Sequence, residues 1–272
     1  MIGQFIFPTC ETGHLRVAAY LRNTQRDGVA RPPVDVSVEL QVFEKGRSIA
    51  HEPAFGTIPF EGVLEVSERT FPAVGEGACD RLVVARLRTP DDVDGYFAQE
   101  HQLTYENPRT GVFDSLLYDQ LPIGKPGRRA SPIILIAPKA WVGRDVNSLV
   151  AFANVGGAVV PTAQGQPLTI SVLSSGGEVL SSNVFEEPEN SALLFDVRAA
   201  LRGHLSDAET PKMVNVVARG GASMYAIMTF VINKRTGNFA LEHSLSPHYY
   251  VTDGLARVRD EALSTLIRPR AS

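Results

Sequence analysis

The sequence lacks the motifs that mark several common classes of enzyme and membrane protein. It contains no GxSxG elbow, no GxxxxGK[ST] phosphate loop and no HExxH helix, the patterns of nucleophilic, nucleotide and zinc chemistry. No run approaches the roughly 20 continuous apolar residues that a membrane-spanning helix needs. The N-terminal stretch MIGQFIFPTCETGH has no basic segment followed by a long apolar one, as a signal peptide would. We therefore expect a cytoplasmic protein that does not associate with membranes.

Cysteine is also scarce, and the chain carries no excess of positive charge. Cys10 and Cys79 are the only thiols, and no CxxC spacing occurs, so these residues do not predict a zinc or redox pair. The count would allow one disulfide in a secreted protein, but reduced thiols are the simpler expectation. The formal net charge is −4, without the basic footprint of a nucleic-acid-binding protein. We predict no nucleic-acid partner and no cofactor.

The sequence is rich in short alternating runs of apolar and polar residues, which is the period of a half-buried strand. VDVSVELQVF (34–43) and LTISVLSS (168–175) are two clear examples. Glycine, proline, asparagine and aspartate separate the runs, as they do at turns. This pattern predicts an all-β fold of antiparallel sandwiches rather than a parallel α/β fold.

The order of these runs repeats along the chain. The offset between copies varies from 126 residues (Arg109 to Arg235) to 134 residues (Pro33 to Pro167), as loop insertions would produce. The matched segments are VAAYLRN with SLVAFAN, PVDVSV with PLTISV, VLEV with LFDV, VVAR with VVAR, and RTG with RTG. The repeat predicts an internal duplication.

The predicted fold is therefore two tandem antiparallel β-sandwich domains, of jelly-roll or immunoglobulin-like type, with a short C-terminal α-helix. The boundaries are 1–124 for the first domain, 125–131 for a linker and 132–252 for the second domain. Residues 253–272 form an amphipathic helix and tail, with Asp253 as N-cap and Pro269 as stop. A further short helix or turn is expected within 195–205.

One segment concentrates groups that could carry chemistry. Glu242, His243, His248, Tyr249 and Tyr250 lie close together near the end of the second domain. His243 and His248 could hold a metal on a β-scaffold, with Glu242 as a further ligand or as the acid–base residue. Pro247 separates the two histidines, and hydrogen bonding and packing at the rim of a sandwich is the favoured explanation for them. No catalytic residue is predicted outright.

The repeat provides an internal comparison for this segment. Both copies keep RTG and a phenylalanine two residues later, Phe113 and Phe239, but the histidines differ between copies. The shared part is therefore predicted to be a turn with an exposed arginine and a buried phenylalanine. Any function should lie in the side chains that the copies do not share, and an anion site at the turn arginines is an alternative. The ligand-binding candidates are His101, Arg109, Arg235, Glu242, His243, His248 and Tyr249.

The segment QEHQLTYENPRTGVFDSLL (99–117), with its weaker counterpart MTFVINKRTGNFALEHSL (228–245), resembles the small β-sandwich of sensory rhodopsin transducer-like proteins. In that family a histidine-containing strand runs into a charged turn and a closing strand. The resemblance implies an oligomeric, non-catalytic protein linked to signalling and ligand binding. The chain departs from the family pattern in its duplication, in the loop at 44–62 and in its C-terminal helix.

Together these features predict a non-enzymatic binding or interaction protein made of two duplicated β-sandwiches, which binds a partner protein or a small ligand and could form a homo-oligomer. Its aromatic residues could line a carbohydrate-binding face. One alternative is a metal-dependent enzyme that uses His243, His248 and Glu242. Another is a structural subunit of a larger assembly.

Overall fold

The structure is a computed structural model of the 272-residue chain. It describes residues 2–24, 33–75, 77, 79–90, 100–119, 121–122, 133–154, 167–186, 188–203, 210–220 and 225–243. The chain divides into two compact units, the first made of Met1–Lys125 with Asn190–Ala192 and the second of Pro126–Glu189 with Leu193–Ser272.

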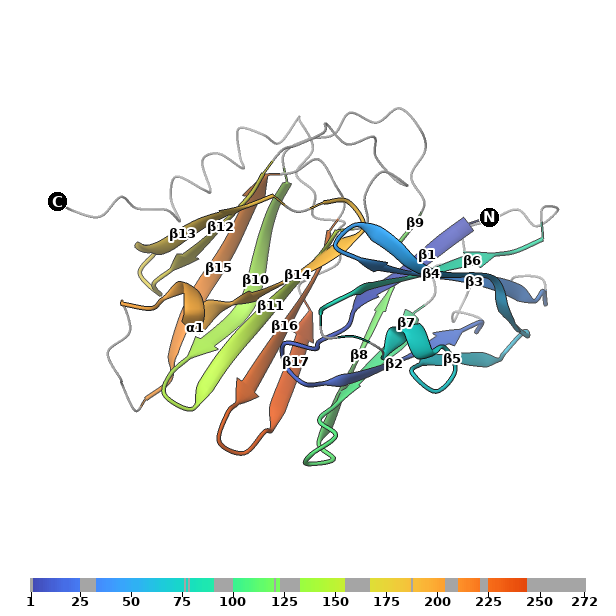
Figure 1. The fold of residues 1–272 in the computed structure, drawn as a ribbon, viewed down its shortest axis with the longest axis horizontal. Coiled ribbons are helices and arrows are strands. Elements are labelled where there is room, and N and C mark those ends of the chain that lie inside the picture. The colour runs from blue at the N-terminus through green and yellow to red at the C-terminus, as the bar shows by residue number, and fades with distance from the viewer. Residues whose placement is uncertain are drawn as a thin grey trace. The chain divides into compact units, whose positions relative to one another are not determined.

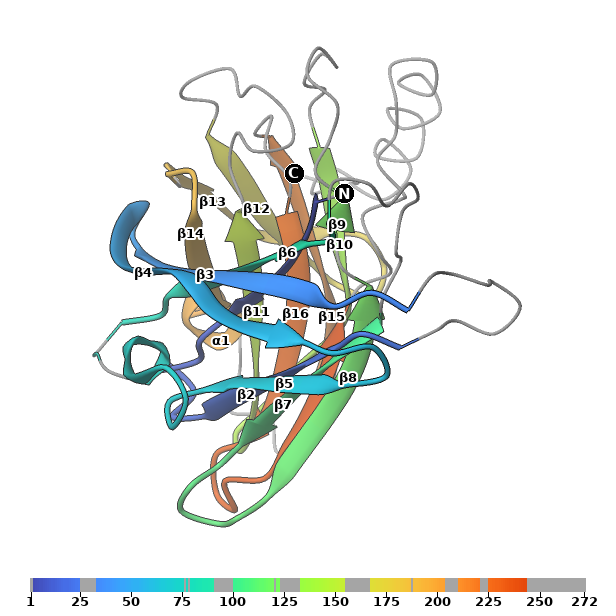
Figure 2. The ribbon, with the colours of Figure 1, turned by 90° about the vertical axis from the view of Figure 1, so that its right-hand side faces the viewer.

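The first module, defined as strands β1 to β9, has two antiparallel sheets (Figure 1). One sheet has the order β4-β3-β6-β1-β9 and the other has the order β5-β2-β7-β8. In Figure 2, β3 and β4 lie in one layer and β2, β5 and β7 in the other. The elements are β1 (Ile2–Pro8), β2 (Arg16–Arg22), β3 (Val36–Glu44), β4 (Arg47–Ile58), β5 (Val63–Ser67), the 3-10 turn η1 (Pro72–Val74), β6 (Leu82–Arg88), β7 (Glu100–Glu106), β8 (Phe113–Asp119) and β9 (Leu121–Pro122).

The second module, defined as strands β10 to β17, also has two antiparallel sheets. Their orders are β10-β15-β12-β13 and β14-β11-β16-β17. The elements are β10 (Ile133–Val142), β11 (Val146–Asn154), β12 (Leu168–Leu173), β13 (Val179–Phe185), β14 (Ser191–Asp196), α1 (Val197–Ala200), β15 (Lys212–Gly220), β16 (Tyr225–Asn233) and β17 (Phe239–His243).

The two modules share one topology. The order β4-β3-β6-β1 in the first matches β13-β12-β15-β10 in the second, and β5-β2-β7-β8 matches β14-β11-β16-β17. Strands β1 to β8 thus each correspond to the strand nine positions later in the order, from β1 with β10 to β8 with β17, and β9 has no counterpart among the described strands. The segments that repeat in sequence fall on corresponding elements, with VVAR on β6 and β15 and RTG between β7–β8 and β16–β17.

Each sandwich is held by apolar side chains that alternate along its strands and meet between its sheets. In the second module one buried cluster draws Ile170 from one sheet and Phe152 from the other. In the first module the ring of Phe5 lies edge-on to His101 with centroids 4.8 Å apart. The hydroxyl of Tyr105 donates to the carbonyl of Pro8 at 2.5 Å. Both contacts join the two sheets, because β1 belongs to one and β7 to the other.

The predicted all-β sandwich fold is confirmed, and helix is sparse in the described part of the chain. The segment expected as a helix or turn within 195–205 contains one helical turn, α1, whose N-cap Asp196 accepts from the backbone N–H of Ala199 at 2.9 Å. The predicted linker at 125–131 and the C-terminal helix at 253–272 lie outside the described residues.

The strand ladders differ from the sequence repeat at one place. Leu40 pairs with Ala85 in the first module, and Ile170 pairs with Ala218 in the second. Since Ala85 and Ala218 occupy the same position of VVAR, Leu40 and Ile170 are equivalent. The prolines that precede the two strands in sequence, which the repeat aligned with each other, are therefore not equivalent in structure.

Phe113 corrects a second expectation. It occupies the same ladder position as Phe239, since Phe113 pairs with Glu106 and Phe239 with Ile232, each just before the turn. Phe239 is buried at 9% exposure, but Phe113 is 69% exposed. The two phenylalanines therefore share a position in the closing strand, but only the ring of Phe239, in the second module, is buried.

Candidate functional site

A polar network lies on the outward face of the five-stranded sheet of the first module. In β3, Val38 and Leu40 are buried and point into the sandwich, so Glu39 and Gln41 point outward. Arg86 of β6 lies beside Glu39 in the ladder and shares its face. Alternation in two neighbouring strands thus brings a carboxylate, an amide and a guanidinium together.

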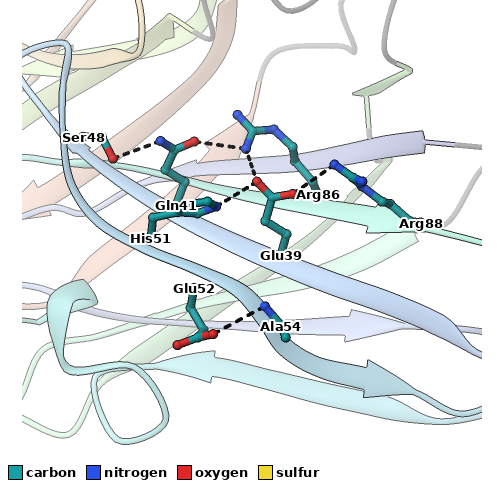
Figure 3. A network of polar contacts seen from close by, with 8 residues as sticks. All are labelled: Glu39, Gln41, Ser48, His51, Glu52, Ala54, Arg86 and Arg88. Atoms are coloured by element: carbon teal, nitrogen blue, oxygen red, sulfur yellow. Dashed lines mark hydrogen bonds and ion pairs between the residues drawn. The ribbon is translucent and has the colours of Figure 1, made fainter.

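Glu39 is the centre of this network (Figure 3). Its Oε1 accepts a hydrogen bond from Nη1 of Arg86 at 2.6 Å and lies 3.1 Å from Nε2 of His51 on β4. Its Oε2 accepts from Nη2 of Arg88 at 3.1 Å. Because an ionised carboxylate only accepts, Nε2 of His51 carries the hydrogen in this contact.

Gln41 holds Arg86 from a second side. Its Oε1 accepts from Nη1 of Arg86 at 3.0 Å, and its Nε2 donates to Oγ of Ser48 at 2.9 Å. Glu52 lies apart from the network in Figure 3 and accepts from the backbone N–H of Ala54 at 3.4 Å. Arg86 is therefore fixed by two side-chain acceptors, of which Glu39 alone carries a charge.

The environment keeps Glu39 ionised. Burial by itself would raise the pKa of its carboxyl, but hydrogen bonds from Arg86 and His51 and the charges of Arg86 and Arg88 outweigh burial and lower that pKa. The side chain of Glu39 is 14% exposed, whereas those of Arg88 and His51 are 53% and 47% exposed. The carboxylate of Glu39 is therefore largely shielded from solvent, whereas Arg88 and His51 form the solvent-exposed part of the network.

Gln4 lies next to this network. It pairs with Arg86 across the β1–β6 ladder, which places both residues on the same face of the sheet. Its side chain is fully buried, and among the described residues neither its Nε2 nor its Oε1 has a hydrogen-bond partner. A buried amide without partners costs about 1–3 kcal/mol, so this position is not optimised for stability alone.

The second module does not repeat the network. From the matched ladders, Thr169 stands where Glu39 stands and Ser171 where Gln41 stands, while Arg219 corresponds to Arg86. Ser182, paired with Ser171, takes the place of His51. The duplicated scaffold therefore keeps one arginine and loses the carboxylate, the amide and the imidazole.

The candidate arginines Arg109 and Arg235 occupy identical positions in two matched turns. The backbone N–H of each donates to the Oδ1 of an asparagine two residues earlier, Asn107 at 2.9 Å and Asn233 at 3.0 Å. Both arginine side chains are exposed. The turn geometry uses their backbone and leaves their side chains facing solvent.

His101 is a core residue of the first module. Its side chain is fully buried, and its Nδ1 accepts from the backbone N–H of Arg22 at 3.0 Å. This contact and the ring of Phe5 fix the imidazole between the sheets. A ligand could reach His101 only if the sandwich opened.

The candidates near the end of the second module are only partly described. Glu242 is half-buried on β17 opposite Thr229, and His243 follows it opposite Met228. His248 and Tyr249 lie outside the described residues, and the metal alternative that needs His248 stays a prediction. Among the residues that the structure describes, no group of three or more His, Cys, Asp and Glu could hold a metal ion.

The predicted set missed Glu39, Gln41, His51, Arg86 and Arg88. The signal was present, because the alternation that buries the valines of VSVELQVF also places Ser37, Glu39 and Gln41 on the opposite face. The asparagines of the two N-x-R-T-G segments, which the sequence marks as turns, were not among the candidate residues either. The polar face of each strand therefore carries the signal for the network, as the apolar face carries the signal for the core.

Comparisons with known proteins do not assign a family. No family model matches the chain, and no curated protein matches it. Among solved structures it is similar to a β-glucuronidase from glycoside hydrolase family 2 (TM-score 0.19), to a Bacteroides uniformis β-glucuronidase 2 bound to a cyclophellitol-6-carboxylate aziridine (0.18) and to a Bacteroides uniformis β-glucuronidase (0.17). Each is 9% identical and covers 89% of this chain, which spans 23%, 26% and 26% of their respective lengths. Likeness at this level assigns neither a fold nor an activity.

No helix in the described part of the chain is both long enough and apolar enough to cross a membrane.

Proposed function

We propose that the chain is a non-enzymatic binding protein built from two duplicated β-sandwich modules, and that the outward face around Glu39 is its binding surface. The observation that carries this proposal is the difference between the copies. The scaffold is the same in both, but the Glu39 network occurs only in the first. A structural need of the fold would apply to both modules, so a feature of one module is better explained by a role outside the fold.

The chemistry of the network favours binding over catalysis. A general acid or base works best with a pKa near the operating pH, whereas the pKa of Glu39 is lowered and both its oxygens are occupied. A carboxylate held in this state positions its neighbours and does not exchange protons near neutral pH. Arg88 and His51, half-exposed beside it, are available to an incoming partner.

The sensory rhodopsin transducer-like resemblance remains a prediction and agrees with a ligand-binding role. A cytoplasmic location and homo-oligomer formation also remain predictions. So do the metal-dependent enzyme and the structural subunit.

The proposal is tested with the full chain by ligand-induced thermal stabilisation, since a ligand that binds only the folded state raises the melting temperature. The panel contains small carboxylates, phosphate, neutral sugars and acidic and basic peptides. The variants are Arg88→Gln in the network and Arg219→Gln, an exposed arginine of the second module, as the matched control. A ligand that stabilises the wild type and Arg219→Gln but not Arg88→Gln supports the proposal. Equal stabilisation of all three proteins by every active ligand would contradict it.

A further inference from the structure

We propose that the Glu39 network is a site for a carboxylate group, with Arg88 as the residue that contacts the ligand and Glu39 and Arg86 as the residues that position it. This inference rests on the proposed function and names the class of ligand. The carboxylate can belong to a small organic acid or to an acidic side chain of a protein, and the two sources share the same chemistry at Arg88.

The first argument is an excess of positive charge. Arg86 and Arg88 both contact Glu39, so two guanidinium groups share one carboxylate. The other arginine ion pairs within the described residues of the first module each join one arginine to one carboxylate. They are Arg16–Glu68, Arg69–Glu65 and Arg81–Glu44. The outward face thus carries a cation that no acidic residue of the network balances.

The second argument is the unused hydrogen-bonding capacity of Arg88. Its guanidinium makes one side-chain contact among the described residues, through Nη2 to Oε2 of Glu39, and the side chain is 53% exposed. A guanidinium is a rigid fork of several N–H donors that matches a carboxylate in two parallel hydrogen bonds. Glu39 holds the guanidinium of Arg88 through Nη2 and leaves its other N–H donors facing outward.

The third argument concerns two polar side chains beside the cations, Gln4 and His51. Gln4 is buried next to Arg86 with its amide unpaired within the described chain. The ring of His51 is half-exposed and uses Nε2 to hold Glu39. A surface assembled only for stability would pair the amide of Gln4 internally and would not leave the ring of His51 half-exposed. The cluster is therefore better suited to a polar, negatively charged partner than to bare solvent.

The second module provides the control. Arg219 occupies the position of Arg86 but is exposed, and Thr169 replaces the carboxylate that would hold it. A mobile surface arginine gives weak, non-specific attraction to anions. Arg88, held by Glu39, should bind with defined geometry, whereas Arg219 should not.

The experiment is isothermal titration of the full chain at low salt with glutarate and with a short, terminally blocked peptide containing glutamate residues. Arg88→Gln is expected to weaken binding about tenfold or more, because it removes the charged guanidinium and its two parallel hydrogen bonds to the carboxylate. Arg219→Gln is expected to leave affinity within about twofold, as for an exposed isolated charge. Melting temperatures of all variants establish that each is folded.

Glu39→Gln tests the charge argument separately. It keeps the shape of the side chain and an amide oxygen that still accepts from an arginine, so the positioning contact is retained while the resident negative charge is removed. It is therefore expected to tighten carboxylate binding about tenfold. Unchanged or weaker binding by a folded Glu39→Gln protein overturns the inference. If Glu39→Gln does not fold, the comparison of Arg88→Gln with Arg219→Gln still decides the matter.

The probes distinguish a small acid from an acidic protein as the source of the carboxylate. They also distinguish failure of this inference from failure of the proposed function. Binding of glutarate that depends on Arg88 supports a small acid, and binding of the peptide alone supports an acidic protein partner. Equally tight, Arg88-dependent binding of inorganic phosphate overturns the carboxylate class. If neither carboxylate probe binds but another ligand still depends on Arg88, this inference fails and the proposed function stands. If no ligand depends on Arg88, both fail.

Discussion

Asn107 and Asn233 perform the same task in the two modules. Each accepts a backbone hydrogen bond on Oδ1 from the residue two positions later, Arg109 at 2.9 Å and Arg235 at 3.0 Å. In each hairpin the backbone carbonyl of the same asparagine also accepts from the glycine four positions later, at 2.9 Å from Gly111 and 2.8 Å from Gly237. The repeated N-x-R-T-G motif is therefore a turn held by its asparagine.

Replacing either asparagine should weaken its own hairpin. Asn107→Ala and Asn233→Ala are each expected to lower the free energy of unfolding by about 1 kcal/mol, the net value of a hydrogen bond of this kind. Urea unfolding followed by circular dichroism measures the effect. Arg109→Ala and Arg235→Ala serve as controls, because the turn uses only the backbone of these exposed residues. A loss in the arginine variants as large as in the asparagine variants would contradict this account.

The glycine of the turn makes a separate prediction. Gly111 has φ of 69°, and a Cβ at this position would meet no atom within 4 Å. The cost of Gly111→Ala is therefore conformational and should be about 1 kcal/mol. Gly111→Asn should cost less, because asparagine tolerates the left-handed region better than alanine does. Thermal unfolding of the two variants in parallel gives the ranking, and an alanine variant as stable as the wild type would show that the strain argument is wrong.

Sequence patterns predicted the fold more fully than the site. Strand alternation and turn residues were enough for an all-β sandwich, because each is a local property of a few neighbouring residues. The register between strands is not local. Nothing in PVDVSV or PLTISV shows that Leu40 and Ile170 are equivalent, since that depends on which residue of β6 or β15 lies opposite.

The network around Glu39 depends both on alternation, which the sequence predicts, and on strand pairing, which it does not predict. Alternation predicts that Glu39 and Gln41 share one face and that Arg86 and Arg88 share one face. It does not predict that β3 and β6 are neighbours, nor that Glu39 stands opposite Arg86. Histidines close together in sequence, such as His243 and His248, stand out in the sequence, whereas His51 meets Glu39 only because β3 and β4 pair.

The two cysteines should differ in reactivity. Burial raises the pKa of the Cys10 thiol well above its ordinary value, and the nearby charge of Asp80 raises it further. Since the thiolate is the reactive form, Cys10 should resist iodoacetamide at neutral pH while the half-buried Cys79 is labelled first. Mass spectrometry of timed samples measures both rates. Urea-unfolded protein, in which both thiols should react, is the control; equal rates in the folded state would contradict the prediction.

Glu39 should make stability depend on acid pH. Because its pKa is lowered in the folded state, ionised Glu39 favours folding above its unfolded-state pKa. That contribution is lost as the pH falls through the folded-state value. Glu39→Gln should therefore lower the free energy of unfolding by about 1–2 kcal/mol at pH 7, the scale of hydrogen bonds to a charged group. The difference from wild type should shrink in strong acid. Urea titrations across this range measure it, and a difference that stays constant with pH would contradict the role of the charge.

Phe113 and Phe239 offer a matched test of how the two modules use one position. Phe239→Ala should lower the free energy of unfolding by about 2–4 kcal/mol, because it empties a buried site, whereas Phe113→Ala should change it by less than about 0.5 kcal/mol, as for an exposed side chain. The single tryptophan, Trp141 on β10, reports unfolding of the second module by fluorescence, and circular dichroism follows the whole chain. If Phe113→Ala proves as costly as Phe239→Ala, the exposed position of the Phe113 ring is contradicted.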